Sequence, residues 1–203
     1  MRYVLLLRGI NVGGRNKIVM ADLRQAVADL GYDNVETYIN SGNLFFDSTK
    51  DRREIVADFQ TFFTERYPFV EQFALLDAQD YQAEIDQLPA WWQEELARKD
   101  VLFFTEGLQK QTMIDYIQSL MLGDEIVSIS AYAIYWGKYS EDSYLQTAYH
   151  KQLAKSPFYK QVTIRNSKTF SAISNYLNTK KNTKTSLICN ALDIFLFAII
   201  GKI

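Results

Sequence analysis

The sequence predicts an α+β fold of two tandem ferredoxin-like (βαββαβ) units with an extra C-terminal helix. Short apolar runs typical of strands recur along the 203 residues, and segments with helical periodicity separate them. The order strand–helix–strand–strand–helix–strand occurs twice, which is the ferredoxin-like pattern. The repeat is one of element order, because no residue-level repeat is visible between the halves.

The order of elements divides the chain into four segments. They are a first ferredoxin-like unit (1–76), a helical connector (77–98), a second unit with a terminal helix (99–177), and a polar linker with an apolar tail (178–203). The content of 48% hydrophobic and 23% charged residues is ordinary for a soluble globular protein.

In the first unit, the unbroken apolar run Tyr3–Leu7 predicts a central strand. A helix is predicted from Met20 to Leu30, because its apolar residues keep helical spacing and Gly31 suits the position after a helix end. The other elements predicted in this unit are a hairpin with strands at 35–39 and 44–46, a helix that begins at a capping box at Asp51 and stops before Pro68, and a strand at 69–76.

A connecting helix is predicted at 77–88, with Asp77 as its cap. The pair Trp91-Trp92 is expected to pack this connector between the halves, and a platform for a base or sugar is the alternative. The elements predicted in the second unit are strands at 101–104, 126–129, 133–136 and 162–164, and helices at 112–122, 140–153 and 169–177.

Cysteine and histidine each occur once, at Cys189 and His150. No disulfide can form within one chain, and zinc sites of the Cys/His type are excluded. The N-terminus runs from Met1-Arg2 into a strand without a small-residue cleavage site, so a secretory signal is not expected. We therefore expect a cytoplasmic protein without a metal or cofactor.

The net charge of −2 hides a marked asymmetry. Residues 1–142 carry 13 Lys and Arg against 23 Asp and Glu, whereas residues 143–192 carry eight Lys and Arg and no acid. The first acid of the chain comes only at Asp22, after four cations. The two acid-free segments could form one positive face, or the two halves could neutralise each other.

The last segment differs in composition from the rest. A polar, lysine-rich linker at 178–186 precedes 17 residues, Leu187–Ile203, that are apolar almost throughout. This length is marginal for a membrane span. We expect the tail to dock on the body or to mediate a homo-oligomer, and membrane contact is disfavoured.

The segment Arg8–Lys17 contains three glycines, two asparagines and three cations directly after the first strand. Glycines let backbone N–H groups approach a ligand, and the cations supply charge, so the segment predicts a loop that approaches an anion. It is close to a P-loop, but Arg15 and Asn16 replace the lysine and the hydroxyl residue that the chemistry requires. The chain has no Gly-x-Gly-x-x-Gly fingerprint either, which gives a dinucleotide fold no support.

The turn Asn40-Ser41-Gly42-Asn43 carries more polar side chains than a hairpin requires. We expect it at the opposite end of the sheet from the Arg8–Lys17 loop, so that a shared pocket would need the second unit or a second chain. The strand that follows lacks the basic residue and spaced aromatics of RNA-recognition domains, which disfavours RNA binding of that type.

Catalytic constellations are not recognisable. His150 is expected to be a surface or boundary residue, and no Gly-x-Ser-x-Gly elbow occurs. Paired carboxylates such as Asp80 and Glu84 are interpreted as solvated helix faces. An enzyme is therefore the third hypothesis, one that would depend on electrostatic positioning of a phosphoryl or glycosyl group.

Two motifs carry a family resemblance: the run 3–17 followed by Met20 and Leu23, and the stretch 38–43. Together they resemble the bacterial family catalogued as domain of unknown function 1697. Thr163-Ile164-Arg165-Asn166 and Thr169 are similar to its C-terminal signature, although Ser167 stands where members usually carry an aromatic residue. The resemblance covers about residues 2–177. It implies a cytoplasmic protein with tandem ferredoxin-like units and brings no established activity.

The leading hypothesis is a module that binds a phosphate-bearing ligand, either a nucleotide or nucleic acid. The opposing hypothesis is a structural or protein-interaction module in which the arginines pair with acids and the asparagines satisfy loop backbone. The candidate binding residues are Arg8, Asn11, Gly13, Gly14, Lys17, Asn40, Ser41, Asn43, Arg165 and Asn166.

Overall fold

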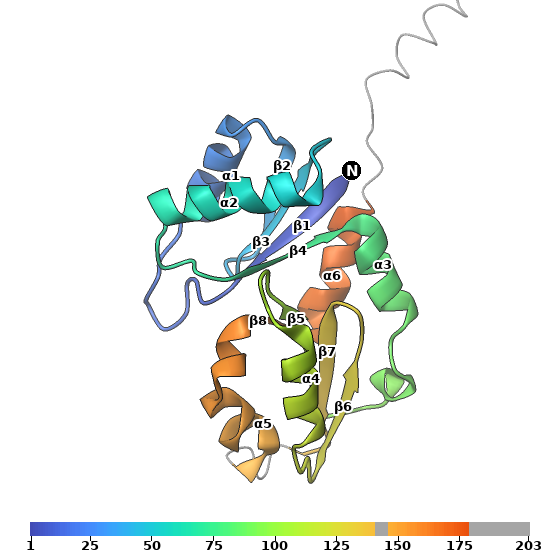
Figure 1. The fold of residues 1–203 in the computed structure, drawn as a ribbon. Helices are drawn as coiled ribbons and strands as arrows, with labels where there is room; N and C mark the ends of the chain where they lie inside the picture. The colour runs from blue at the N-terminus through green and yellow to red at the C-terminus, as the bar shows by residue number, and fades with distance from the viewer. Residues whose placement is uncertain (141–145, 179–203) are drawn as a thin grey trace, which may run out of the picture.

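The computed structural model describes residues 1–140 and 146–178, which form an α+β arrangement around two antiparallel four-stranded sheets (Figure 1). The first sheet has the order β2-β3-β1-β4 and the second the order β6-β7-β5-β8. The strands of the first sheet are β1 (Arg2–Leu7), β2 (Asp33–Tyr38), β3 (Asn43–Asp47) and β4 (Phe73–Asp77). Those of the second are β5 (Arg98–Phe104), β6 (Glu125–Ile129), β7 (Ala133–Lys138) and β8 (Val162–Asn166).

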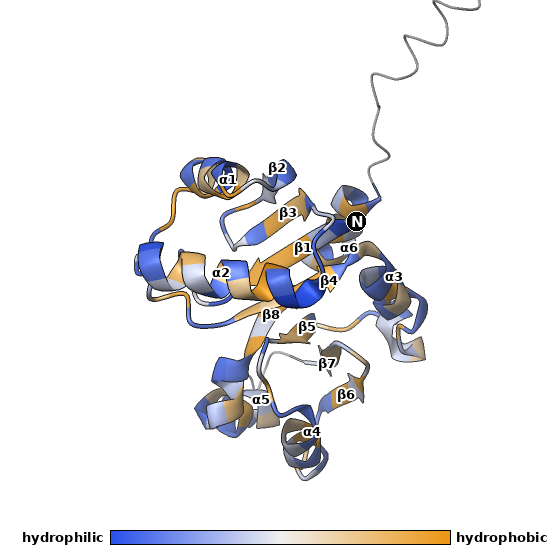
Figure 2. Ribbon diagram, turned by 45° about the horizontal axis from the view of Figure 1, so that its top comes forward, coloured by the Kyte–Doolittle hydropathy of each residue, from blue (hydrophilic) through white to orange (hydrophobic). Residues whose placement is uncertain are grey.

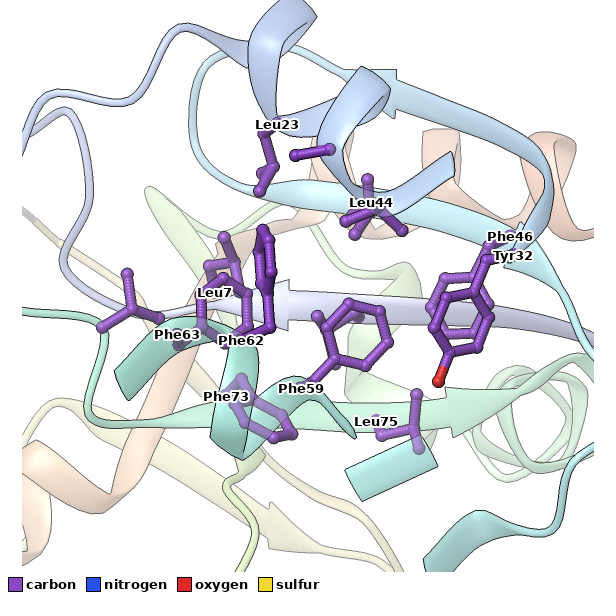
Figure 3. Close-up of a cluster of buried hydrophobic side chains, with 14 of the residues drawn as sticks. Leu7, Leu23, Tyr32, Leu44, Phe46, Phe59, Phe62, Phe63, Phe73 and Leu75 are labelled. Atoms are coloured by element: carbon purple, nitrogen blue, oxygen red, sulfur yellow. The ribbon is translucent and has the colours of Figure 1, made fainter. Parts of the chain in front are cut away.

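Helices α1 (Met20–Asp29) and α2 (Arg52–Arg66) cover one face of the first sheet (Figure 1). The predicted capping box at the start of α2 is confirmed, because Asp51 and Glu54 each accept a hydrogen bond from the other's backbone N–H. Gly31 follows α1 at φ +90°, as predicted for a helix end. Rings dominate the core beneath the two helices, where Phe59 stacks on Phe63 (Figure 3).

The second sheet is covered on one face by α4 (Lys110–Gln118), α5 (Ala148–Lys151) and two 3₁₀ turns (Leu153–Lys155 and Pro157–Gln161). The helix predicted at 140–153 is not continuous in its described part, because the Thr147 hydroxyl caps a new helix by accepting the His150 N–H. The first turns of that prediction, 141–145, lie outside the described residues.

The remaining faces of both sheets share one core with α3 (Ala78–Asp86) and α6 (Ser167–Leu177). Trp91 and Trp92 are each 7% exposed and lie in this shared core, where Trp92 contacts Tyr135 and Phe170 edge to face. The prediction that they pack the connector between the halves is confirmed, and this burial leaves no platform for a base or sugar. Hydrophobic clusters pack on both faces of the central strands of each sheet, so among the described residues these strands present no open face of the kind on which RNA-recognition domains stack bases.

Hydropathy follows the same layering, and β1 is hydrophobic over its inner residues Val4–Leu7 (Figure 2). Within the described ranges, no helix is long and apolar enough to cross a membrane. The tail Leu187–Ile203 and most of the linker before it lie outside the described residues, so the docking expected of that tail stays a prediction.

Candidate functional site

The loop after β1 and the turn before β3 lie at the same end of the first sheet. The N–H of Leu7 donates to the Gly42 carbonyl at 2.8 Å, and the Asn11 side chain donates to the Asn40 carbonyl at 2.9 Å. The expectation that they lie at opposite ends is wrong. β1 runs antiparallel to β3, so β1 ends where β3 begins. The loop after β1 and the turn before β3 therefore lie at the same end of the sheet.

Asn11 organises the loop rather than facing outward. Its side chain donates to the Ile18 carbonyl at 3.0 Å and accepts the Ile18 N–H at 2.8 Å, while its backbone sits at φ +55°. Asn16 also has a positive φ, and its side chain donates to the Gly9 carbonyl. Both asparagines thus satisfy loop backbone, as the interaction hypothesis expects. Gly13, Gly14 and Lys17 lie exposed in the same loop.

Arg165 of β8 is buried where the second sheet meets the first, and it is 4% exposed. Its guanidinium donates to Asn43 Oδ1 at 2.5 Å and to the Leu7 and Gly42 carbonyls at 3.1 and 3.2 Å. It also donates to the Thr163 hydroxyl at 2.9 Å. Burial lowers its pKa to about 10, which still leaves it protonated near neutral pH.

The role predicted for Arg165 as a ligand-binding charge needs correction, because a guanidinium enclosed by protein acceptors presents no surface to an anion. Asn43 is fully buried and donates to the Tyr38 carbonyl and the Ser41 hydroxyl. Asn166 caps α6 by accepting the Thr169 N–H at 2.8 Å. Together with Asn11, four of the ten candidate residues therefore have side-chain partners within the protein that account for their polar groups.

The side chain of Arg8, in the loop after β1, contacts the 3₁₀ turn that precedes β8 in the second sheet. Its Nε donates to the Lys160 carbonyl at 3.0 Å, and its Nη2 donates to the Tyr159 carbonyl at 2.7 Å. The guanidinium carbon lies 5.2 Å from the centroid of the Tyr159 ring. Partial burial lowers the pKa of Arg8 from its ordinary value. The two acceptors are neutral carbonyls, so they hold the guanidinium in place without neutralising its charge.

A hollow of about 210 Å³ opens beside Arg8, between residues of the first half of the chain and Lys160. Its lining residues are Arg8, Gly9, Asn16, Phe69, Glu71, Gln72 and Lys160. Of the residues proposed from sequence it contains only Arg8, since Lys17 and Arg165 do not line it. Sequence reasoning missed Lys160 and Phe69. Lys160 had one usable signal, because it lies in the acid-free stretch of the chain.

The residues that line the hollow are of types suited to binding a ligand. Arg8 and Lys160 supply positive charge, Asn16 and Gln72 supply amides, and Phe69 supplies an apolar ring that is 37% exposed. His150 is not among its lining residues. Among residues 1–140 and 146–178, no group of three or more His, Cys, Asp or Glu is arranged to hold a metal ion.

Comparison with known proteins supports the resemblance noted in the sequence. The family model described as "Protein of unknown function (DUF1697)" matches residues 1–135. A solved structure, that of the conserved bacterial protein SP0830 from Streptococcus pneumoniae, is similar at 53% identity with a TM-score of 0.84. The match covers 87% of this chain and 98% of that chain. A search of curated proteins finds no match.

Proposed function

The chain belongs to the DUF1697 family of proteins of unknown function, and from that premise we propose that it binds a phosphate-bearing ligand, a nucleotide or nucleic acid, in the hollow beside Arg8 and Lys160. The observation that carries the proposal is the fixed guanidinium of Arg8. Two neutral carbonyls hold it at the rim of an open hollow, and no ion pair is recorded for Arg8 or Lys160 within the described ranges.

The volume of the hollow supports binding of a phosphate group rather than a whole nucleotide. Pockets that enclose drug-sized ligands have volumes of roughly 300–1,000 Å³, and this one has about 210 Å³. Arg8 offers its remaining guanidinium nitrogen to a phosphate oxygen, and Lys160 offers a mobile point charge. The rest of the ligand lies outside, where the ring of Phe69 offers a stacking surface for a base.

Glu71 also lines the hollow, and its carboxylate opposes a bound anion. Arg15 and Lys17, exposed in the neighbouring loop, add positive charge around the same face. This balance favours a weak ligand whose affinity depends on salt, because the cations act at the surface. The proposal therefore combines a specific contact at Arg8 with a general attraction to phosphate.

The opposing function, a structural or protein-interaction module without a small-molecule site, has its own support. Asn11, Asn43 and Arg165 use their side chains to hold the loop and the unit junction together. These contacts account for much of the family signature without a ligand. A structural role also covers the two carbonyl contacts of Arg8, but it leaves the hollow and the side-chain charge of Lys160 unexplained, and for that reason we rank phosphate binding first.

The proposal also covers the fold of the two halves and the location of the protein in the cell. We infer that the two sheets belong to two ferredoxin-like units, 1–76 and 99–177, joined by a connector at 77–98. The strand orders β2-β3-β1-β4 and β6-β7-β5-β8 support this inference, since both sheets arrange their four successive strands in the same order. A cytoplasmic location suits a ligand of the nucleotide class.

Binding of a labelled single-stranded oligonucleotide, followed by fluorescence anisotropy across a salt series, tests the proposal. Lys160→Ala is the cleanest variant, because Lys160 holds Arg8 through its backbone carbonyl and its side chain can be removed without breaking that bond. We expect at least threefold weaker binding. The slope of log affinity against log salt concentration should fall by about one, which corresponds to the loss of one phosphate contact. Arg8→Ala should weaken binding further.

Arg53→Ala is the matched control, since Arg53 is an exposed cation of α2 that does not line the hollow. It should bind the oligonucleotide as the parent does. Inorganic phosphate and ADP, titrated by NMR, test whether a small ligand suffices. If the parent binds none of these probes, or if Lys160→Ala and Arg53→Ala lose the same affinity, phosphate binding in the hollow is wrong.

A further inference from the structure

The four outer edges of the two sheets differ in how they are protected. The edges at β4 and β8 lie against the opposite unit. The Phe73 carbonyl at the start of β4 accepts the Glu106 N–H from the second unit, and the Thr163 hydroxyl of β8 donates to the Leu7 carbonyl of the first. These contacts keep a further strand from pairing along the whole of β4 or β8.

The edge at β2 is protected by charge and irregularity. It carries Asp33 and Glu36, and its register against β3 shifts between them. Charged side chains and bulges are common devices that prevent pairing with another chain. β6 has a regular register against β7, and after its first residue, Glu125, residues 126–129 read Ile-Val-Ser-Ile without a charge. It forms the outer margin of the second sheet (Figure 1, Figure 2).

The backbone of β6 offers hydrogen bonds at this margin. The N–H of Ser130 donates to the Ala133 carbonyl, which identifies a hydrogen-bonded pair between β6 and β7. Such pairs alternate along an antiparallel ladder. Val127 and Ile129 therefore point their N–H and C=O groups away from β7, toward the open side.

An apolar groove adjoins the same edge. It has a volume of about 400 Å³ and lies between β6 and the end of α4. Its lining residues are Ile117, Gln118, Leu120, Leu122, Val127 and Ile129. Met121, in the same loop, is 88% exposed. Side chains and backbone of this edge thus combine a hydrophobic surface with peptide groups that have no strand partner among the described residues, the two requirements for strand addition.

We propose that this edge binds a second copy of the chain, with two β6 strands paired antiparallel about a two-fold axis at Ser128. This register sets Val127 of each copy opposite Ile129 of the other, so the outward peptide groups of both residues are satisfied at once. It also places apolar side chain against apolar side chain and joins the two grooves.

Charge favours a second copy as the occupant. Residues 126–129 contain no ionisable group, so the pairing sets no like charges opposite each other. Glu125, the first residue of β6, is turned inward, where its carboxylate accepts the Trp136 indole N–H at 2.8 Å and the Tyr149 N–H at 3.2 Å. Protein edges that avoid self-pairing usually carry a charge at such a position.

Sedimentation of the full chain between about 5 and 500 µM tests the proposal. The parent should form a dimer, and Val127→Lys should weaken it at least tenfold, because two lysines would then meet at the joined groove. Leu30→Lys, at the exposed end of α1, is the control and should sediment as the parent does. Circular dichroism of each variant shows that it is folded.

A disulfide tests the register. Ser128→Cys, made in a chain with Cys189→Ser, should oxidise to a covalent dimer, since the axis brings the two side chains together at a non-hydrogen-bonded pair about 4.5 Å apart at Cα. Thr37→Cys on the edge strand β2 should not. A monomer at every concentration overturns the proposal. So does a dimer that survives Val127→Lys but is lost in Ile199→Lys, because the apolar tail would then form the contact.

Discussion

At the scale of single residues, the guanidinium of Arg165 holds the loop, the turn and β8 together. Replacing it by alanine would leave Asn43 Oδ1 and the Leu7 and Gly42 carbonyls without this donor in a buried place. We expect Arg165→Ala to lower the free energy of unfolding by about 3–5 kcal/mol. Urea denaturation followed by circular dichroism measures it.

Arg165→Lys separates charge from geometry. An ammonium keeps the charge but cannot reach three acceptors with a planar fork, so this variant should recover only part of the loss. Lys168→Ala, an exposed cation in the same acid-free stretch, is the control and should stay within about 0.5 kcal/mol of the parent. An Arg165→Ala variant as stable as this control would contradict the structural role.

The buried carboxyl group of Asp100 is expected to make the stability of the fold depend on pH. Burial raises the pKa of its carboxyl against the opposing effect of Arg98, and its Oδ1 has no hydrogen-bond partner among the described residues. Because the folded pKa lies above the unfolded one, the folded chain holds the proton more tightly, and stability is lost as pH rises through the two values. Asp100→Asn removes this loss, so its stability relative to the parent should increase between about pH 3.5 and pH 7.

Denaturation of both proteins at a series of pH values measures the difference. Asn keeps an oxygen that can accept from Arg98, as Asp100 Oδ2 does at 2.5 Å. Asp33→Asn on the exposed strand β2 is the matched control. A relative stability of Asp100→Asn that falls toward pH 7 would show that ionised Asp100 stabilises the fold.

Residue types alone did not distinguish the two roles of the basic residues. Arg8 follows β1 and Arg165 lies near the end of β8, and asparagines stand close to both in the sequence or in the fold. An arginine suits an anion and a set of carbonyls equally well. Only burial separates them, and the burial of Arg165 arises from the packing of β8 against the first unit, which is a long-range contact.

At the scale of elements, local signals predicted what local interactions decide. The capping box at Asp51, the end of α1 before Gly31 and the apolar strand at β1 all follow from neighbouring residues. The strand predicted at 69–76 begins only at Phe73, since Val70 is bonded back to Tyr67 in a turn. The continuous helix predicted at 140–153 was wrong in its described part for a similar reason, namely a side-chain cap at Thr147.

The relation between elements was the weaker part of the prediction. The loop at 8–17 and the turn at 40–43 were expected at opposite ends of the sheet, although the element order already requires β1 and β3 to run antiparallel as neighbours. The hollow beside Arg8 needs contacts between residues that are 151 and 152 positions apart in the chain. No local pattern encodes such a contact, which explains why Lys160 was missed.

At the scale of the whole molecule, the shared core makes the two units one cooperative structure. Residues of both sheets, α3 and α6 pack in it, and Arg165 adds polar contacts across the same junction. Neither unit can unfold without exposing this surface to water. We therefore expect a single unfolding transition for the described body of the chain.

Ile55→Val tests this coupling. Ile55 lies in the core beneath α2 and is fully buried, so the change should cost about 1 kcal/mol. The three tryptophans lie elsewhere, two in the shared core and Trp136 beneath the helices of the second unit. Their fluorescence therefore reports on regions that the substitution does not touch. If the units unfold together, the fluorescence and circular dichroism midpoints shift by the same amount in urea. If the fluorescence midpoint stays at the parent value while the circular dichroism signal divides into two steps, the units are independent and the shared core contributes little to their association.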